Sequence, residues 1–215
     1  MSLAMTQRKT LQWKRKLLHL FNGSLGFSLY NFSGLSEMIV IGVLTVFFLA
    51  SFSVDIYRMT HPSFDDQFCT TFGEVIRESE KGHISSMTKG MFAFIPVLLL
   101  FPPQVDLLIV PFFTLGDPAG AIAGFYLGKH KYKKHKSVEG SLAVWVVCSL
   151  ATFLVVTFLF PPLGWSGLKT FSFVALAGLI GAVAEGLFSR FDDNLTVPFI
   201  GAPCLWVLCK VYAVI

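Results

Sequence analysis

The chain has 215 residues, of which 54% are hydrophobic and 14% charged, and 23 of them are phenylalanine. This composition excludes a soluble domain of the same size and predicts a single integral membrane domain over residues 1–215. The formal net charge of +4 does not indicate a nucleic-acid partner, because the basic residues lie between apolar runs, where membrane topology explains them.

The apolar runs, taken in chain order, predict an all-α polytopic membrane bundle of about seven transmembrane helices. Pro102-Pro103 and Pro161-Pro162 are predicted to form sharp turns between runs. The predicted spans are Leu17–Tyr30, Met38–Val54, Lys89–Phe101, Val105–Gly128, Ser141–Phe160, Thr170–Phe188 and Val197–Ile215.

The only long polar segment, residues 55–88, is expected to be cytosolic or to lie at the membrane interface. Its apolar side chains recur at helical spacing, with charged residues elsewhere around the helix, which predicts an amphipathic helix on the membrane surface. This apolar stripe is either a membrane anchor or a substrate gate. Its members are Phe64, Phe68, Phe72, Val75 and Ile76.

The basic residues are distributed unevenly between the two sides of the predicted bundle. With a cytosolic N-terminus, five lie before the first span, four in residues 55–89, five in residues 129–140 and one at Arg190, whereas only Lys169 lies in an outer loop. The positive-inside rule therefore predicts a cytosolic N-terminus and an external C-terminus. The membrane would be a bacterial inner membrane or that of the endoplasmic reticulum or a plastid.

An acidic residue stands within the fourth predicted span, and a basic loop follows that span. Gly116, Gly120, Gly124 and Gly128 are four residues apart, so they share one helix face that either packs against another helix or admits a ligand. Pro118 suits the first turn of a helix, and we expect this span to break at Gly116–Pro118 and start afresh with Asp117 as N-cap. Such a helix start would bind an anion, and the Asp117 carboxylate would bind a cation that bridges to phosphate.

Other polar residues are brought to the cytosolic side by the predicted topology. Acidic groups for a divalent ion beside lysine and arginine for phosphate oxygens are what phosphoryl transfer requires. The sequence contains no Walker P-loop, and no histidine has an evident serine partner. The converging residues are Arg15, Lys16, His19, Asp117, Lys136, Ser137, Glu139, Ser141, Glu185, Asp192, Asp193 and Asn194.

Four blocks of the sequence resemble the CTP-dependent polyisoprenol and lipid kinases, a family that includes dolichol kinase, phytol kinase and the yeast-type CTP-dependent diacylglycerol kinase. The blocks are RKLLH at 15–19, GDPAGAIAGFYLG at 116–128, KSVEGS at 136–141, and Glu185 with DDNLTVP at 192–198. The resemblance covers most of the chain in the same order. It implies transfer of the CTP γ-phosphoryl group to the hydroxyl of a lipid alcohol (polyprenol or dolichol, phytol, or diacylglycerol), with Mg²⁺ or another divalent cation.

The same resemblance implies roles for particular residues. Phe125 departs from the family pattern, in which an arginine commonly follows the second motif glycine, so that any phosphate contact of that arginine would pass to the lysines of 129–136. The implied catalytic residues are Asp117, Lys136, Glu139 and Asp193; the implied metal ligands are Asp117, Glu185, Asp193 and Asn194; and the implied nucleotide-binding residues are Arg15, Lys16, Gly120, Gly124, Lys136, Ser137, Gly140, Ser141 and Asn194.

Two other functions remain open from the sequence. A phosphatidate cytidylyltransferase also combines a GD-containing membrane helix with a K(S/T)xEG loop, but its long C-terminal signature is replaced here by SRFDDNLTVPFIGAP. A small transporter would use Asp117 and a broken helix as a midplane site, although the charged motifs gather at one face and no internal repeat is evident.

Overall fold

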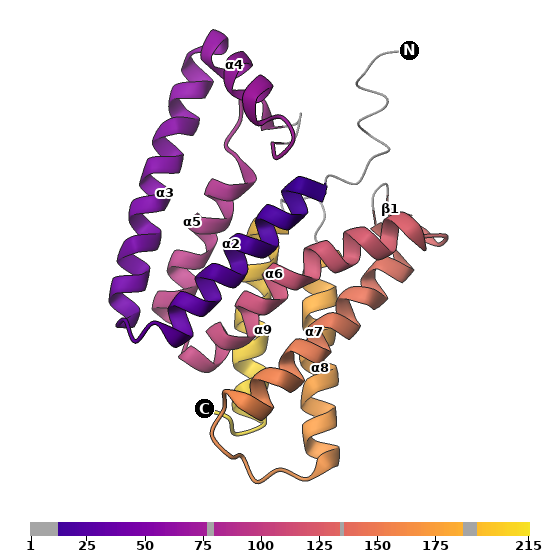
Figure 1. The fold of residues 1–215 in the computed structure, drawn as a ribbon. Helices are drawn as coiled ribbons and strands as arrows, with labels where there is room; N and C mark the ends of the chain where they lie inside the picture. Colours follow the sequence, from indigo (N-terminus) through magenta and orange to yellow (C-terminus); the bar gives the residue numbers. More distant parts are fainter. Residues whose placement is uncertain (1–12, 77–79, 134–135, 187–192) are drawn as a thin grey trace.

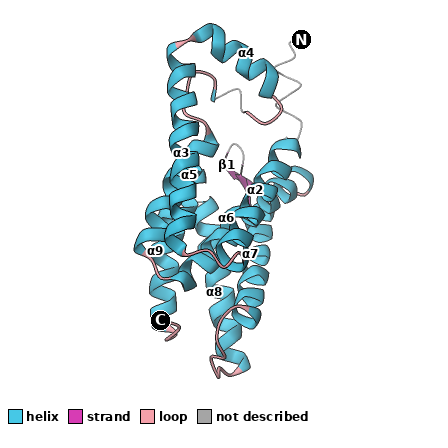
Figure 2. Cartoon of the chain, turned by 60° about the vertical axis from the view of Figure 1, so that its left-hand side comes forward, coloured by secondary structure: helices cyan, strands magenta, loops and turns pink. Residues whose placement is uncertain are grey.

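A computed structural model of the chain describes residues 13–76, 80–133, 136–186 and 193–215. Almost all of this part of the chain is helical, which confirms the predicted all-α membrane bundle (Figures 1 and 2). The elements are α2 (Trp13–Phe32), α3 (Glu37–Thr60), α4 (Pro62–Phe72), α5 (Ser86–Leu100), α6 (Pro103–Tyr126), β1 (Lys131–Lys133), β2 (Lys136–Ser137), α7 (Val138–Phe158), α8 (Gly167–Gly186) and α9 (Asp193–Val211).

Five helices of the described chain are long and apolar enough to cross a membrane: α3, α6, α7, α8 and, from Asn194, α9. The other two predicted spans form helices that do not meet this standard. α5 has only 15 residues, and α2 begins with a basic turn. Because α2 packs against α6 and α5 packs against α3 and α9, both belong to the bundle. The count of seven spans therefore remains a prediction.

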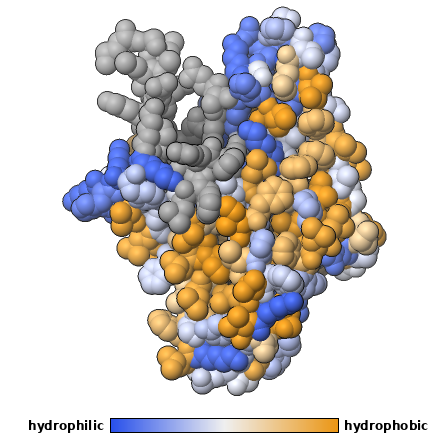
Figure 3. Space-filling view, turned by 180° about the vertical axis from the view of Figure 1, so that it is seen from behind, coloured by the Kyte–Doolittle hydropathy of each residue, from blue (hydrophilic) through white to orange (hydrophobic). Residues whose placement is uncertain are grey.

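The polar segments gather at one end of the bundle. The start of α2, helix α4 and the β1–β2 hairpin lie at this end, called the hairpin end below, whereas the α7–α8 connection and the C-terminus lie at the other (Figure 1). Figure 3 shows a broad hydrophobic surface over the middle of the molecule, with hydrophilic residues toward the ends. This is the distribution that a bilayer requires.

Helix α6 is the central helix of the bundle. Its buried residues Val105, Leu108, Ile109 and Phe112 pack in one core with residues of α7, α8 and α9. Desolvating these side chains against one another fixes α6 relative to its neighbours, since protein interiors pack closely and leave few alternative arrangements.

The predicted break in this helix is wrong, because α6 continues from Pro103 to Tyr126 through both Pro111 and Pro118. Prolines are tolerated inside membrane helices where neighbouring helices and hydroxyl side chains compensate for the lost backbone hydrogen bonds. The carbonyls that lose their donor are those of Leu107 and Thr114, and α2 and α7 both pack on α6. Asp117 is consequently an interior residue of α6 and not the N-cap of a new helix.

The glycine strip of α6 faces α7. A Cβ added at Gly120 would lie 2.8 Å from the Cγ2 atom of Val144, and one at Gly124 would lie 3.4 Å from the Oγ atom of Ser137. From the side of α7, a Cβ at Gly140 would lie 2.9 Å from the Gly120 carbonyl oxygen. Helix packing, one of the two expected roles, is therefore what the strip performs.

The predicted amphipathic helix is present as α4, but it ends at Phe72, so that Val75 and Ile76 lie in the turn beyond it. Phe64, Phe68 and Phe72 form a continuous run of ring contacts, with centroids 6.0 Å and 4.8 Å apart. Gly73 follows and ends the helix. The aromatic stripe is therefore confirmed over a shorter length than predicted.

A buried arginine of α3 connects α4 to the bundle. Arg58, only 1% exposed, donates from Nε to Asp65 at 2.8 Å and from Nη1 to Asp55 at 2.9 Å. Asp55 also accepts hydrogen bonds from Ser85 and Thr88 at the start of α5. Burial disfavours the ionised form of Asp65, but the hydrogen bond from Arg58 holds the pKa of this carboxyl below its usual value. This network joins α3, α4 and α5, and it was not predicted from the sequence.

Candidate active site

An ion pair between α2 and α6 lies in the half of α6 nearer the hairpin end. Lys16 Nζ donates to Asp117 Oδ2, and the two side chains are 7% and 22% exposed. Two turns further along α2, Gly23 lets the helices approach, since a Cβ there would lie 2.2 Å from the Thr114 hydroxyl. The close crossing at Gly23 therefore holds Lys16 beside Asp117.

Further positive groups surround this pair. Arg15 and, when protonated, His19 act electrostatically on the Asp117 carboxylate. The His19 ring also bonds through Nε2 to the Phe113 carbonyl oxygen at 2.9 Å and packs on the Phe113 ring. The first two turns of α2 thus bring Arg15, Lys16 and His19 close to Asp117, as the predicted convergence requires.

A second ion pair joins the basic loop to α8. Lys136 Nζ donates to Glu185 Oε1, and the two side chains are 14% and 6% exposed. A Cβ at Gly120 would lie 3.2 Å from Glu185 Oε1, so this pair borders the glycine strip. Asp117 and Gly120 are one turn apart, or about 4.5 Å along the α6 axis. The two ion pairs therefore lie about one turn of α6 apart, although their members are spread along the sequence from Lys16 to Glu185.

The basic loop folds back as a short antiparallel hairpin that leads directly into α7. Ser137 is the N-cap of α7, and its hydroxyl accepts the Gly140 amide N–H at 3.1 Å. Glu139 accepts hydrogen bonds from the His130 amide and ring, the latter at 2.6 Å. The KSVEGS block thus forms the helix start that the sequence analysis had assigned to Asp117.

Two contacts in this region were not predicted. The Tyr132 hydroxyl bonds that of Ser141 at 2.7 Å, and Lys133 donates to the Gly186 carbonyl oxygen at 3.3 Å. The His130–Glu139 and Tyr132–Ser141 contacts each join residues nine apart. The equal spacing of nine residues is the one sequence feature that these two contacts share. It indicates a contact only when the hairpin is already known to pair these residues.

The remaining predicted site residues lie at the start of α9. Asn194 approaches α5, since a Cβ at Gly90 would lie 3.9 Å from the Asn194 Cβ and 3.3 Å from the Phe113 ring. Asp193 is the first residue of α9, but its side chain and all of Asp192 fall outside the described part of the chain. The catalytic role of Asp193 and the metal-binding roles of Asp193 and Asn194 remain predictions.

The described residues offer few carboxylates to a divalent ion. They gather no set of three or more histidine, cysteine, aspartate or glutamate side chains suited to a metal. Mg²⁺ commonly uses only one or two protein carboxylates and takes its other ligands from water and substrate phosphates. Asp117 and Glu185, close to each other along α6, fit this second mode.

The fold and this cluster define a class: a polytopic helical membrane protein with lysine–carboxylate pairs buried between its helices near one end. The chain is 30% identical over 202 residues to CTP-dependent diacylglycerol kinase 1 of Schizosaccharomyces pombe, covering 90% of this chain and 92% of the relative. It therefore belongs to the family of CTP-dependent diacylglycerol kinases.

Two further relatives carry the same name. CTP-dependent diacylglycerol kinase 1 of Saccharomyces cerevisiae is 24% identical over 89% of this chain and 72% of its own length. That of Eremothecium gossypii is 23% identical over 87% of this chain and 64% of its own length. No protein-family model matches the chain, and no solved structure matches it.

Proposed function

We propose that this chain transfers the γ-phosphoryl group of CTP to the hydroxyl of diacylglycerol, which yields phosphatidate and CDP. The observation that carries the proposal is the neighbouring position of the Lys16–Asp117 and Lys136–Glu185 pairs. Their cations suit phosphate oxygens and their carboxylates suit a proton or a metal ion, which are the two needs of phosphoryl transfer. Family membership supports both the nucleotide and the lipid.

In this reaction the lipid hydroxyl oxygen forms a bond to the γ-phosphorus while the bond from that phosphorus to the β–γ bridging oxygen breaks. The departing CDP takes the electron pair of the broken bond. Asp117 accepts the hydroxyl proton or, in the alternative role, binds the metal ion. Lys16, Arg15 and Lys136 neutralise the phosphate oxygens, and the pairing of each lysine with a carboxylate positions its ammonium group before the nucleotide binds.

The start of α7 supplies a second kind of phosphate contact. Its first-turn N–H groups and helix dipole favour an anion, and Gly140 and Ser141 lie in that turn. Asp117 and Glu185, together with Asp193 and Asn194, would hold Mg²⁺, which when bound would reduce the negative charge of the phosphates. Glu139, hydrogen-bonded to His130, would keep the hairpin over this site.

The site would face the cytosol, where CTP is available. The hairpin end carries the basic loops, and positive loops favour the cytosolic side. The N-terminus would then be cytosolic and the C-terminus external.

The test is a product analysis with purified protein in nanodiscs that contain diacylglycerol and Mg²⁺. CTP labelled in the γ-phosphate should give labelled phosphatidate and unlabelled CDP, and polyprenol, dolichol or phytol should be poorer acceptors. Release of pyrophosphate from CTP and phosphatidate would instead indicate a cytidylyltransferase. Absence of any CTP-dependent product, with the protein folded, would refute the proposal.

A further inference from the structure

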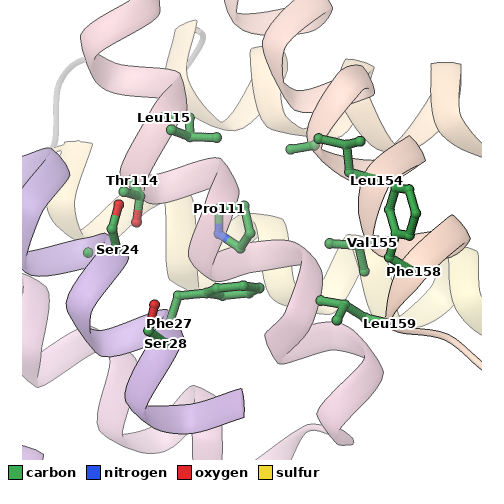
Figure 4. Close-up of a pocket in the computed structure, with 12 residues that line it drawn as sticks. Ser24, Phe27, Ser28, Pro111, Thr114, Leu115, Leu154, Val155, Phe158 and Leu159 are labelled. Carbon is green, nitrogen blue, oxygen red and sulfur yellow. The ribbon is translucent and has the colours of Figure 1, made fainter. Parts of the chain in front are cut away.

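A groove in the surface of the bundle lies below the Lys16–Asp117 pair, on the side away from the hairpin end. Its volume is about 380 Å³, which falls in the usual range of ligand sites, about 300–1,000 Å³. Residues of α2, α6 and α7 line it, and Figure 4 shows Thr114 of α6 beside Ser24 of α2, with Val155 of α7 on the opposite side.

The floor of the groove is apolar, and its outer side is open. Ala151 and Val155 are 6% and 4% exposed, whereas Leu154 and Phe158 at the rim are 45% and 74% exposed. All four belong to α7, which is long and apolar enough to span the membrane. The groove therefore opens toward the hydrocarbon of the bilayer and not toward water.

The polar members of the lining lie on the two helices that hold the ion pair. Ser24 and Ser28 are one turn apart on α2, and Thr114 lies one turn below Asp117 on α6. Ser24 is eight residues from Lys16, about 12 Å along the α2 axis. The groove thus begins about one turn from the proposed reaction site and extends along the bundle from there.

We propose that this groove holds one acyl chain of the diacylglycerol substrate, which places the glycerol hydroxyl at Asp117. The inference rests on the proposed function and adds to it the binding position of the lipid. An acyl chain suits the groove because it matches the apolar floor, enters sideways from the bilayer, and leaves the polar glycerol at the end nearest the charged pair. The Ser24 hydroxyl, at the end of the groove nearer the charged pair, can donate a hydrogen bond to an ester oxygen, whereas the Thr114 hydroxyl already donates to the Val110 carbonyl.

The test uses two tryptophan substitutions on α7. Leu154→Trp fills the groove from its rim, whereas Leu150→Trp, one turn away, fills a separate cavity against α8. Both leucines are about half exposed, at 45% and 56%, so both variants should fold. Activity is measured with dioctanoylglycerol and with a dioleoyl substrate, whose chains occupy different lengths of a groove.

In Leu154→Trp, kcat/KM for the long-chain substrate should fall at least about tenfold relative to that for the short-chain one, as expected when a pocket loses room for methylene groups. Leu150→Trp should leave this ratio unchanged. An unchanged ratio in Leu154→Trp, or the larger change in Leu150→Trp, would overturn the inference while the kinase activity itself stands. Loss of the proposed function would show differently, as an inactive wild-type protein.

A binding measurement that does not depend on turnover completes the test. A diacylglycerol with a photoreactive diazirine in mid-chain should label α2 residues 24–28 or α7 residues 151–159 in the wild type. The labelling should be lost in Leu154→Trp and kept in Leu150→Trp. Labelling confined to the cavity between α7 and α8 would place the chain elsewhere and refute the inference.

Discussion

Lys16 is buried, Lys136 is partly buried, and each faces a carboxylate. Removing such charges from water costs free energy that their mutual attraction often does not fully return, so an apolar pair would hold the helices equally well. Ionisable residues inside a membrane bundle are therefore functional candidates by default. The lysine–carboxylate pairs are best explained as a charge arrangement prepared for an anionic substrate.

Lys136→Ala should weaken CTP binding. The charge-assisted bond that it removes is worth roughly 1.5–3 kcal/mol, so the KM for CTP should rise about tenfold to a hundredfold. Lys131→Ala, in the first strand of the same hairpin, is the comparison variant and should raise KM far less, because Lys131 is exposed whereas Lys136 is held beside Glu185. Equal effects of both variants on CTP kinetics would mean that the hairpin acts only through its total charge.

Asp117 and Glu185 could be predicted from the sequence because charged residues are rare in apolar spans and so are conspicuous, whereas Lys136 was distinguished from the other lysines of its loop only by the KSVEGS block. Their partners could not be predicted in the same way. Lys16 and Asp117 are 101 residues apart, and which of several basic residues meets Asp117 depends on where α2 crosses α6. That crossing is set by Gly23 against Thr114, a steric fit that periodicity does not reveal.

Helix α6 shows where sequence rules for soluble helices fail in a membrane. Pro118 after an aspartate predicts a helix start, yet the cost of exposing backbone groups to hydrocarbon keeps the helix continuous. Gly116, Gly120 and Gly124, in contrast, share one helix face as predicted, whereas Gly128 lies beyond the end of α6. The role of this face in packing against α7 makes its glycines indirect determinants of the site, because Gly120 lies beside Glu185.

Gly120→Ala should destabilise the protein by about 1–3 kcal/mol, because the new methyl group would overlap Val144 and crowd Glu185. The melting temperature in detergent and the CTP-dependent activity should both fall. Gly26→Ala in α2 is the matched control, since nothing lies within 4 Å of its added methyl group, and it should melt no lower than the wild type. A wild-type melting temperature for Gly120→Ala would contradict the close α6–α7 contact.

Arg58→Leu should also destabilise the protein, by about 3–5 kcal/mol, because it leaves Asp55 and Asp65 buried without their cation. Limited proteolysis should then cut the α4 region faster. Lys81→Leu, which breaks the exposed pair with Asp66, should change neither property measurably. If the two variants behaved alike, the Arg58 network would not be what joins α4 to α3 and α5.

The molecule as a whole presents its basic segments at one end and an apolar surface between its ends. This arrangement follows from the sequence through the positive-inside rule and the spacing of the apolar runs. Composition alone could not decide whether the shorter apolar helices, above all α5, belong to the bundle. Their packing against longer helices places them there.

The orientation of the bundle is tested with reporter proteins inserted after Lys133 and after Ser166. The hairpin should read as cytosolic and the α7–α8 connection as external, because these segments lie at opposite ends of the bundle. The reverse result would place the proposed CTP site on the side of the membrane that lacks CTP. If both reporters were found on the same side, α7, which lies between the two insertion sites, could not be a single span.

The central claim, that the Lys16–Asp117 pair belongs to the reaction site, is tested most directly by Asp117→Asn and Lys16→Gln, singly and combined. Each single change leaves one charge buried without its partner and should lower the melting temperature; the double variant removes both charges and should recover most of this loss. Turnover of the recovered double variant should nevertheless stay at least about a hundredfold below wild type, since a positioned acid–base group or metal ligand is missing. A double variant with wild-type stability and wild-type turnover would show that the pair only holds α2 to α6, and the reaction site would have to lie elsewhere.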